Sequence, residues 1–295
     1  MNIKFLKLNL IVLFLVINLT AYSQPEGTVL ENRKITSSIL GKEMTYSVYL
    51  PPDYKTSERD YPVIYLLHGI RMNSTTWIQE GEIKRYVDNA IEDGTIPTMI
   101  LIMPDAGKTY YINSAGGKLR YEDFFIKELI PGVEKIYRIR SEKKYRGIAG
   151  FSMGGYGALY LALKHADFFS ATATLGAAVR NDSAFLKFTD EIYEANFSSA
   201  FGNIPKGANR ITPFYRAHSV LDIVQNEPSS YLSRVRYWID CGDDDPLSEG
   251  NSLLHTMLLK KNVPHEFRVR DGAHNWNYWH SGIVDALKYI GESFR

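Results

Sequence analysis

Ser152 is flanked by glycines in a way that suits covalent chemistry. Residues 150–154 (GFSMG) satisfy the pattern G-x-S-x-G, in which the serine occupies a sharp turn between a strand and a helix. In a chain with 22 glycines, an ordinary glycine turn is the alternative. The surroundings favour the reactive serine, because the apolar residues 147–149 precede it and the helix-forming residues 158–165 follow it.

A serine hydroxyl becomes a nucleophile when a base accepts its proton and an acid orients that base. Chains with this pattern carry the three residues in the order serine, acid, histidine. After Ser152, residues 241–247 (CGDDDPL) offer three aspartates directly behind a predicted strand. The residues alone leave the choice among Asp243, Asp244 and Asp245 open, with a solvated turn or a weak calcium loop as the alternative. The EF-hand spacing and its closing glutamate are missing.

His274 is the predicted base, because it lies in a glycine-containing loop after the last predicted strand. His280 is its rival, but it falls in the closing helix, where its side chain is expected to point away. Asp240, at the end of a strand, is expected to be structural.

Attack on a carbonyl also requires hydrogen-bond donors for the oxyanion. We expect these to be the backbone N–H groups of Met153, directly after the serine, and of Ile70, in the loop after an earlier strand. His68, two residues before Ile70, is expected to form hydrogen bonds within that loop.

Five aromatic residues fall in or beside these loops and are candidates to bind a sugar or phenolic ring, although packing is an equally good explanation for each. They are Trp77, Tyr110, Tyr111, Trp276 and Trp279. The sequence contains no recognisable metal-ligand set and no glycine-rich phosphate loop, so we expect neither a metal nor a cofactor.

The elements that must position these residues alternate along the chain. Residues 28–50 predict two antiparallel edge strands, buried strands are expected at 62–67, 99–103, 147–149 and 170–175, and further strands are expected at 235–239 and 266–270. Helices are expected at 80–92, 121–137 (interrupted near Pro131), 248–262 and after His274 to about Ile290. This is an α/β protein with a doubly wound, mostly parallel sheet whose reactive loops lie at the carboxyl ends of strands.

Residues 177–233 break the alternation. They contain a predicted helix at 182–201 followed by loops with glycine and proline. An insertion of this length at one edge of a sheet is suited to form a lid or a substrate wall.

The first 23 residues have the pattern of a cleavable signal peptide, with Lys4 and Lys7, an apolar run over 8–19 and a small-x-small site at 21–23. An uncleaved anchor is the minor alternative. Residues 24–295 are then expected to form one domain in a secreted or periplasmic protein, without further membrane attachment. Its formal net charge changes from +1 to −1 when the two lysines leave, which gives no electrostatic reason to expect nucleic acid as a partner. Cys241 is the only cysteine, so no internal disulfide is expected.

Taken together, the motifs resemble the esterase D family of α/β-hydrolases. This family includes the feruloyl and acetyl xylan esterases of carbohydrate esterase family one, S-formylglutathione hydrolases, enterochelin esterases and the antigen 85 mycolyltransferases. The similarity extends over about residues 40–290. It is carried by residues 49–54 (YLPPDY), 61–69 (YPVIYLLHG), 149–155 (AGFSMGG), 239–245 (IDCGDDD) and 272–276 (GAHNW), with Trp279.

The resemblance implies the α/β-hydrolase fold, Ser152 as nucleophile, His274 as base and the Ile70 and Met153 oxyanion hole. It also implies Asp245 as the acid, since the family places its aspartate at the last position of Gly-x-x-Asp, which starts here at Gly242. Asn275 is a departure, because many relatives carry aspartate after the histidine.

The function expected from these features is that of an exported serine carboxylesterase, acting on feruloyl or acetyl esters of plant polysaccharide. The alternatives are a nonspecific short-chain acyl esterase, an enterochelin-type siderophore esterase or an acyltransferase. Export and the presence of only one cysteine argue against an S-formylglutathione hydrolase. A non-catalytic carbohydrate-binding relative is the alternative of another class, and the complete set of Ser152, Asp245 and His274 argues against it.

Overall fold

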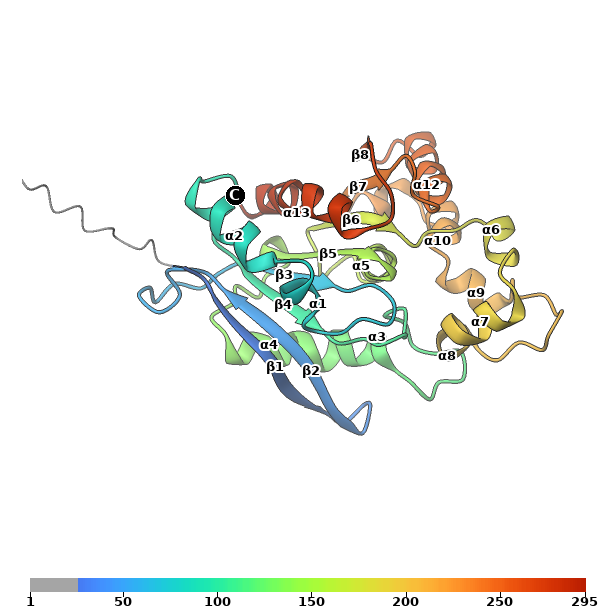
Figure 1. Cartoon of the computed structure of the whole chain (residues 1–295), viewed down its shortest axis with the longest axis horizontal. Helices are drawn as coiled ribbons and strands as arrows, with labels where there is room; N and C mark the ends of the chain where they lie inside the picture. Colours follow the sequence, from blue (N-terminus) through green and yellow to red (C-terminus); the bar gives the residue numbers. More distant parts are fainter. Residues whose placement is uncertain (1–25) are drawn as a thin grey trace, which may run out of the picture.

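Eight strands form one mixed sheet with helices on both faces (Figure 1). The structure is a computed structural model, and it describes residues 26–295. The predicted signal peptide and the first two residues after it lie outside the described residues. Within 26–295, no helix combines the length and the apolar character needed to cross a membrane.

The order of the strands in the sheet is β1-β2-β4-β3-β5-β6-β7-β8. The pairs β1–β2 and β2–β4 are antiparallel, and all the other neighbours are parallel. This confirms the mostly parallel sheet with an antiparallel amino-terminal part, although only β1 of its two strands is at the edge. The strands are β1 (Thr28–Ser37), β2 (Lys42–Leu50), β3 (Val63–Leu67), β4 (Ile100–Pro104), β5 (Arg146–Ser152), β6 (Ala171–Ala177), β7 (Arg236–Gly242) and β8 (His265–Arg270).

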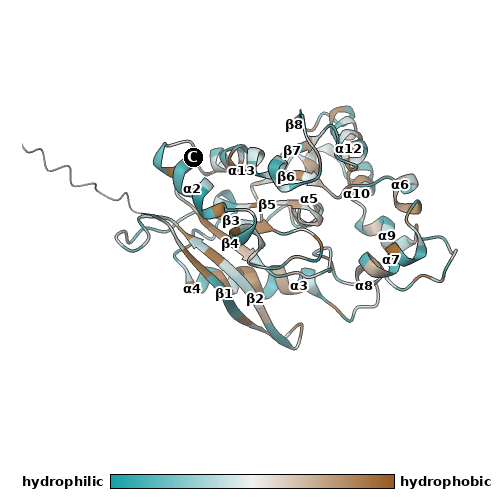
Figure 2. Cartoon of the chain, viewed as in Figure 1, coloured by the Kyte–Doolittle hydropathy of each residue, from teal (hydrophilic) through white to brown (hydrophobic). Residues whose placement is uncertain are grey.

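Alternate residues of the central strands pack into two separate apolar layers. In β3, Ile64 and Leu66 face the layer that contains α2 and α13, whereas Tyr65 faces the layer that contains α4, α5 and α12. Because both faces are covered, the strand is a continuous apolar run rather than an alternating one. Figure 2 shows the complementary pattern in the helices, where outer surfaces such as that of α2 are hydrophilic.

The helices before the insertion are α1 (Thr76–Gln79), α2 (Ile83–Glu92), α3 (Tyr121–Phe124), a π-helical turn (Phe125–Leu129), α4 (Ile130–Ile136), a 3₁₀ turn (Lys143–Tyr145) and α5 (Met153–Lys164). The insertion contains α6 (Asp182–Leu186), α7 (Asp190–Asn196), α8 (Ser198–Phe201), α9 (Pro213–His218), α10 (Val220–Asn226) and α11 (Ser229–Leu232). The chain closes with α12 (Ser248–Lys260), α13 (Trp276–Gly291) and a 3₁₀ turn (Glu292–Phe294).

The prediction of one helix over 182–201 is wrong, because the segment forms three short helices. The side chain of Asn181 accepts a hydrogen bond from the Ala184 N–H at the start of α6, and Thr189 accepts one from the Ile192 N–H at the start of α7. A residue that caps a helix in this way has non-helical backbone angles, so Thr189 separates the first two helices.

Other boundaries also differ from the prediction, and three of the differences have a clear cause or consequence. The helix predicted at 80–92 begins only at Ile83, because Glu82 has a left-handed backbone (φ 45°). Strand β7 continues to Gly242, so residues 240–242 belong to the strand and not to the following loop. The interruption expected near Pro131 is the π-helical turn before it, and Pro131 itself lies in the first turn of α4, where its missing N–H is tolerated.

Candidate active site

Ser152 ends β5 and directly precedes α5, in a backbone conformation that few residues other than glycine adopt (φ 55°, ψ −122°). Such strain persists only where the surroundings impose it. Here the turn is enforced by close backbone contacts. A Cβ on Gly150 would lie 2.5 Å from the carbonyl of Gly154, and one on Gly154 would lie 2.3 Å from the carbonyl oxygen of Leu67. Both glycines of the motif are therefore needed for the turn to close.

The hydroxyl of Ser152 forms a hydrogen bond with His274. The distance from Ser152 Oγ to His274 Nε2 is 2.9 Å, and the distance from His274 Nδ1 to Asp245 Oδ2 is 2.7 Å. Ser152 is the last residue of β5, and Asp245 and His274 lie in the loops after β7 and β8, so all three are at the carboxyl ends of parallel strands. The chain of contacts has the geometry in which a carboxylate orients a histidine and the histidine accepts a serine proton.

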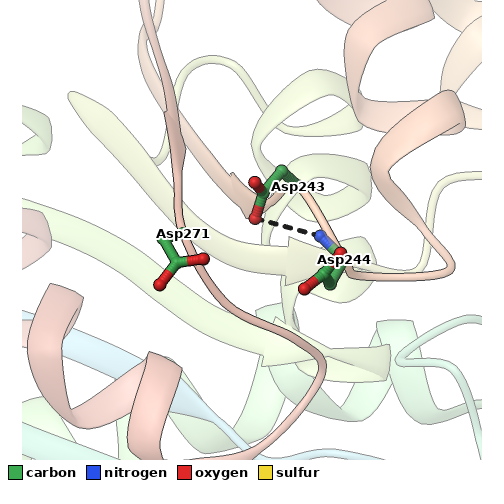
Figure 3. A group of neighbouring side chains, drawn as sticks. All are labelled: Asp243, Asp244 and Asp271. Atoms are coloured by element: carbon green, nitrogen blue, oxygen red, sulfur yellow. Dashed lines mark hydrogen bonds between the residues drawn. The ribbon is translucent and has the colours of Figure 1, made fainter.

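Of the three neighbouring aspartates, only Asp245 reaches His274. Its side chain is buried, and its Oδ1 accepts a hydrogen bond from the Leu247 N–H at 2.8 Å, which fixes the carboxylate. Asp243 and Asp244 are exposed and lie beside Asp271 (Figure 3). The Asp243 carboxylate accepts hydrogen bonds from the N–H groups of Asp244 and Gly272, so it ties the β7 loop to the β8 loop.

Gly176 allows the acid and the base to approach the end of β6. Its backbone is left-handed (φ 54°), and a Cβ there would lie 2.5 Å from Asp245 Oδ2 and 3.2 Å from His274 Nδ1. Any side chain at position 176 would occupy the space of this hydrogen bond. Sequence reasoning missed Gly176, and its only signal is a glycine at the carboxyl end of an apolar strand.

Asn251 connects the loop of the acid to the strand beside the serine. Its Nδ2 donates to the carbonyl oxygens of Ala177 and Leu247, both at 2.9 Å, and the side chain is fully buried. Ala177 is the residue that pairs with Ser152 in the sheet. Asn251 was also missed, since an asparagine inside a predicted helix carries no distinctive pattern.

The residues predicted to supply the oxyanion donors lie on two sides of the serine. Met153 is the first residue of α5, where a backbone N–H has no partner within the helix. Ile70 is half-buried in the loop after β3, and among the described residues its N–H donates no hydrogen bond. His68 holds this loop, because its Nε2 accepts from the Ala106 N–H at 2.9 Å and its Nδ1 donates to the Gly69 carbonyl at 2.7 Å.

This pair of contacts requires the neutral His68 ring with its proton on Nδ1. Burial lowers the pKa of His68, although its hydrogen bond to the Gly69 carbonyl opposes the shift. His68 therefore braces the loop, as expected, and is not placed to act on Ser152.

The other two residues weighed from the sequence lie apart from the serine. The His280 Nε2 is 2.9 Å from the carbonyl oxygen of Glu80, and its ring stacks on Tyr86 and Trp276. Asp240 is buried, accepts a short hydrogen bond from the Tyr278 hydroxyl and pairs with Arg270. Burial raises the pKa of Asp240, although the hydrogen bonds from Tyr278 and Arg270 oppose the shift.

Of the two roles considered for Trp77, Tyr111 and Trp279, the structure shows packing, because other side chains cover all three. Trp77 donates through Nε1 to the Leu67 carbonyl and is 1% exposed, and the hydroxyl of the fully buried Tyr111 donates to the His68 carbonyl. Trp279 stacks on Phe151 and meets the His274 ring edge to face at 5.1 Å.

The two remaining aromatic candidates differ in their surroundings. Trp276 is half-buried, donates to Glu80 and packs on Trp77 and Phe151, so it ties α13 to the α1–α2 corner. Tyr110 is buried in a strained, left-handed conformation (φ 53°) and lines a small cavity beneath the insertion.

This cavity has room for only about 20 Å³. By the same measure one water molecule needs roughly 10–15 Å³, so the cavity holds one or two waters and no aromatic ring. Its walls are almost entirely aromatic or aliphatic, with one cation. They are formed by Tyr110, Tyr156, Ala178, Val179, Arg180, Phe185, Phe197, Phe201, Tyr215, His218, Ser219 and Val220.

Comparison with known proteins gives the family. The sequence matches the Esterase family, described as "Putative esterase", over residues 37–290. The esterase Rv1288 of Mycobacterium tuberculosis is 29% identical over 260 residues, which cover 82% of this chain and 54% of the relative. The chain thus spans about half the length of that relative. The acetyl esterase of Caldicellulosiruptor saccharolyticus is 23% identical over 267 residues, covering 87% of this chain and 96% of the relative.

The fold is also that of known esterases. A solved ferulic acid esterase superposes with a TM-score of 0.78 at 29% sequence identity, covering 92% of this chain and 99% of the other. Residues 37–290, which match the Esterase family, include every strand from β2 to β8 and also Ser152, Asp245 and His274. The chain therefore belongs to the Esterase family and has the α/β-hydrolase fold predicted from its sequence.

Proposed function

We propose that this protein is a serine carboxylesterase in which Ser152 is the nucleophile, His274 the general base and Asp245 the acid. The observation that supports the proposal most strongly is the continuous hydrogen-bonded chain from Ser152 Oγ through His274 to the buried Asp245. Membership of the Esterase family supports the same reaction class.

The reaction follows from these contacts. His274 Nε2 accepts the Ser152 proton while Oγ attacks the ester carbonyl carbon, and the carbonyl electrons move to its oxygen. The N–H groups of Met153 and Ile70 are the proposed donors to this oxyanion. The tetrahedral intermediate then expels the alcohol, which takes the proton from His274. A water molecule, deprotonated by His274, releases the acid in the same two steps.

For the substrate, we propose feruloyl or acetyl esters of plant polysaccharide. The similarity to a ferulic acid esterase and to an acetyl esterase supports both. A nonspecific short-chain esterase is the second candidate, and the match to a family described only as "Putative esterase" supports it.

Export is part of the proposal, and it rests on the signal-peptide pattern of residues 1–23. We expect a chain that begins at Gln24 in the periplasm or the medium. Mass spectrometry of the protein recovered from each fraction would measure its mass and its first residue. If the full-length chain stayed in the cytoplasm, the proposal of export would be wrong, and the esterase proposal would be unaffected.

The first experiment compares the wild-type chain with Ser152→Ala. Wild type is expected to hydrolyse p-nitrophenyl acetate and to be labelled by a fluorophosphonate at Ser152. The variant is expected to lose labelling and to lose kcat by a factor on the order of 10⁶. A wild-type protein that is folded, unlabelled and inactive would contradict the proposal.

A second experiment separates the candidate acids. Asp245→Asn is expected to lower kcat by about 10⁴-fold, because it removes the acceptor that fixes the His274 tautomer. The matched change Asp244→Asn, at an exposed carboxylate, is expected to leave kcat within about threefold of wild type. Equal losses in the two variants would argue against Asp245 as the acid.

The substrate is tested by measuring kcat/KM for methyl ferulate, acetylated xylan and tributyrin with one preparation of the enzyme. A clear preference for either of the first two supports a polysaccharide ester. A preference for tributyrin would favour the nonspecific esterase.

A further inference from the structure

Arg180 brings a positive charge to the end of the strand beside the nucleophile. The Ala178 N–H donates to the carbonyl oxygen of Ser152 at 2.8 Å, and Arg180 Nη1 donates to the Ala178 carbonyl at 3.2 Å. A single residue therefore links the guanidinium to the backbone of Ser152. A Cβ on Gly250 would lie 2.0 Å from the Val179 carbonyl oxygen, so α12 holds this segment in place.

Most donors of this guanidinium are unused. Arginine has five N–H donors. Within residues 26–295, the guanidinium of Arg180 donates one hydrogen bond, to the Ala178 carbonyl. No carboxylate of the described residues lies within 4.0 Å of it. The nearby acids are engaged elsewhere, since Asp182 pairs with Arg216 and Glu249 accepts from the Asn181 amide.

Aromatic rings surround the cation without providing an acceptor. The guanidinium carbon lies 5.3 Å from the centre of the Phe188 ring and 5.7 Å from that of Phe197. Such rings stabilise a cation through their faces and leave its in-plane N–H groups free for a ligand. Arg180 also lines the cavity of about 20 Å³, which fits a group of a few atoms but no ring.

We propose that Arg180 binds a carboxylate that the ester substrate carries close to its scissile bond. A carboxylate matches the guanidinium in charge and in its planar, two-pronged geometry, and it is small enough for the cavity. The inference rests on the proposed function, because it takes Ser152 as the nucleophile. It narrows the substrate class to acidic esters, such as an acylated sugar next to a uronic acid or the half-ester of a dicarboxylic acid.

The test uses two pairs of esters that differ in charge. p-Nitrophenyl hydrogen glutarate and p-nitrophenyl pentanoate differ in a carboxylate on the acyl side, and 4-acetoxybenzoate and 4-methylphenyl acetate differ in one on the alcohol side. For each pair, the ratio of kcat/KM for the charged ester to that for the neutral ester is measured. The proteins are wild type, Arg180→Gln, Arg180→Lys and the control Arg268→Gln. Arg268 is an exposed arginine of β8 that pairs with Glu266.

In at least one pair, the ratio is expected to fall about tenfold or more in Arg180→Gln and less in Arg180→Lys. It is expected to stay at the wild-type value in Arg268→Gln, which loses the same charge elsewhere. The pair that responds identifies the side of the ester that carries the carboxylate. Ratios within twofold of wild type in Arg180→Gln for both pairs would overturn the inference, as would an equal fall in Arg268→Gln.

A binding measurement separates this inference from the proposed function. Calorimetric titration of Ser152→Ala with 4-acetoxybenzoate and with monoethyl glutarate needs no turnover. Weaker binding of either compound after adding Arg180→Gln supports the contact, and equal binding of both contradicts it. If the wild-type protein hydrolysed none of the four esters, the esterase proposal itself would be wrong.

Discussion

At Gly176, the addition of a single carbon atom would disturb the active site. Its left-handed backbone disfavours every other residue, and its missing side chain leaves the space in which Asp245 meets His274. Gly94 has the same backbone preference (φ 74°), but a Cβ there would have no atom within 4 Å. Substituting the two glycines by alanine therefore separates the effect of backbone strain, which both variants have, from the effect of the contact with Asp245, which only the Gly176 variant has.

Gly94→Ala is expected to lower the free energy of unfolding by about 1–2 kcal/mol, because alanine is strained in this conformation. Gly176→Ala is expected to lower it further, because its Cβ would also meet Asp245. Only Gly176→Ala is expected to lower kcat, by about 100-fold, since its methyl group displaces the acid from the histidine. The measurements are urea unfolding and kcat for p-nitrophenyl acetate. Equal activity of the two variants would contradict this account.

At the scale of residues, the sequence predicted the positions of Ser152 and His274 because their order along the chain and their loops are specific. It left three adjacent aspartates open, and the resemblance to a family was needed to choose Asp245. The burial that separates Asp245 from Asp243 and Asp244 depends on α12 and β8, which no local pattern contains. For the same reason, the sequence did not reveal that Trp77, Tyr111 and Trp279 face inward.

At the scale of elements, the last helix explains the unusual residue after His274. Asn275 caps α13, because its Oδ1 accepts a hydrogen bond from the Tyr278 N–H at 3.2 Å. Asparagine and aspartate serve about equally well at this position. The asparagine found here, where the family resemblance implies aspartate, thus keeps the same structural contact.

Asn275→Asp is expected to leave the free energy of unfolding within about 0.5 kcal/mol of wild type, and Asn275→Ala to lower it by about 1 kcal/mol. Urea unfolding of both variants at pH 7 provides the measurement. If the alanine variant were as stable as wild type, the cap would be irrelevant to α13.

The elements themselves were predictable where burial is continuous. The central strands β3, β4 and β6 are apolar runs, and all the strands of the parallel region occur where the pattern placed them, within a few residues. The insertion was less predictable, because its short helices depend on caps such as Thr189 and on aromatic side chains from distant segments. Tyr110, for example, stacks on Phe197 and meets Tyr156 edge to face, which no window of sequence around either residue could reveal.

For the whole molecule, one buried and two partly buried histidines make the free energy of unfolding depend on pH. Burial lowers the pKa of His68, His218 and His255, so these rings stay neutral in the fold below the pH at which they gain a proton in the unfolded chain. The unfolded state then binds more protons, and the free energy of unfolding decreases as the pH falls below about 6.5. Above that value both states are neutral and this contribution to the pH dependence disappears.

His68→Gln is expected to make the decrease between pH 7 and pH 5 shallower, because one such group is removed. The largest effect of one proton is about 1.4 kcal/mol per pH unit. Urea unfolding of wild type and variant at pH 7, 6 and 5 would measure it. If the free energy of unfolding changed equally with pH in the two proteins, His68 would not contribute to the pH dependence.

The insertion also has a topological role. It leaves β6 at its carboxyl end and must return the chain to the opposite end of β7, because the two strands are parallel neighbours. Helix α10, buried against α5 and α12, completes this crossover, while α6 to α9 extend beyond the sheet (Figure 1). The segment thus divides into a part that connectivity fixes and a part that is free to vary. Replacement of the outer helices would therefore leave the connection between β6 and β7 intact.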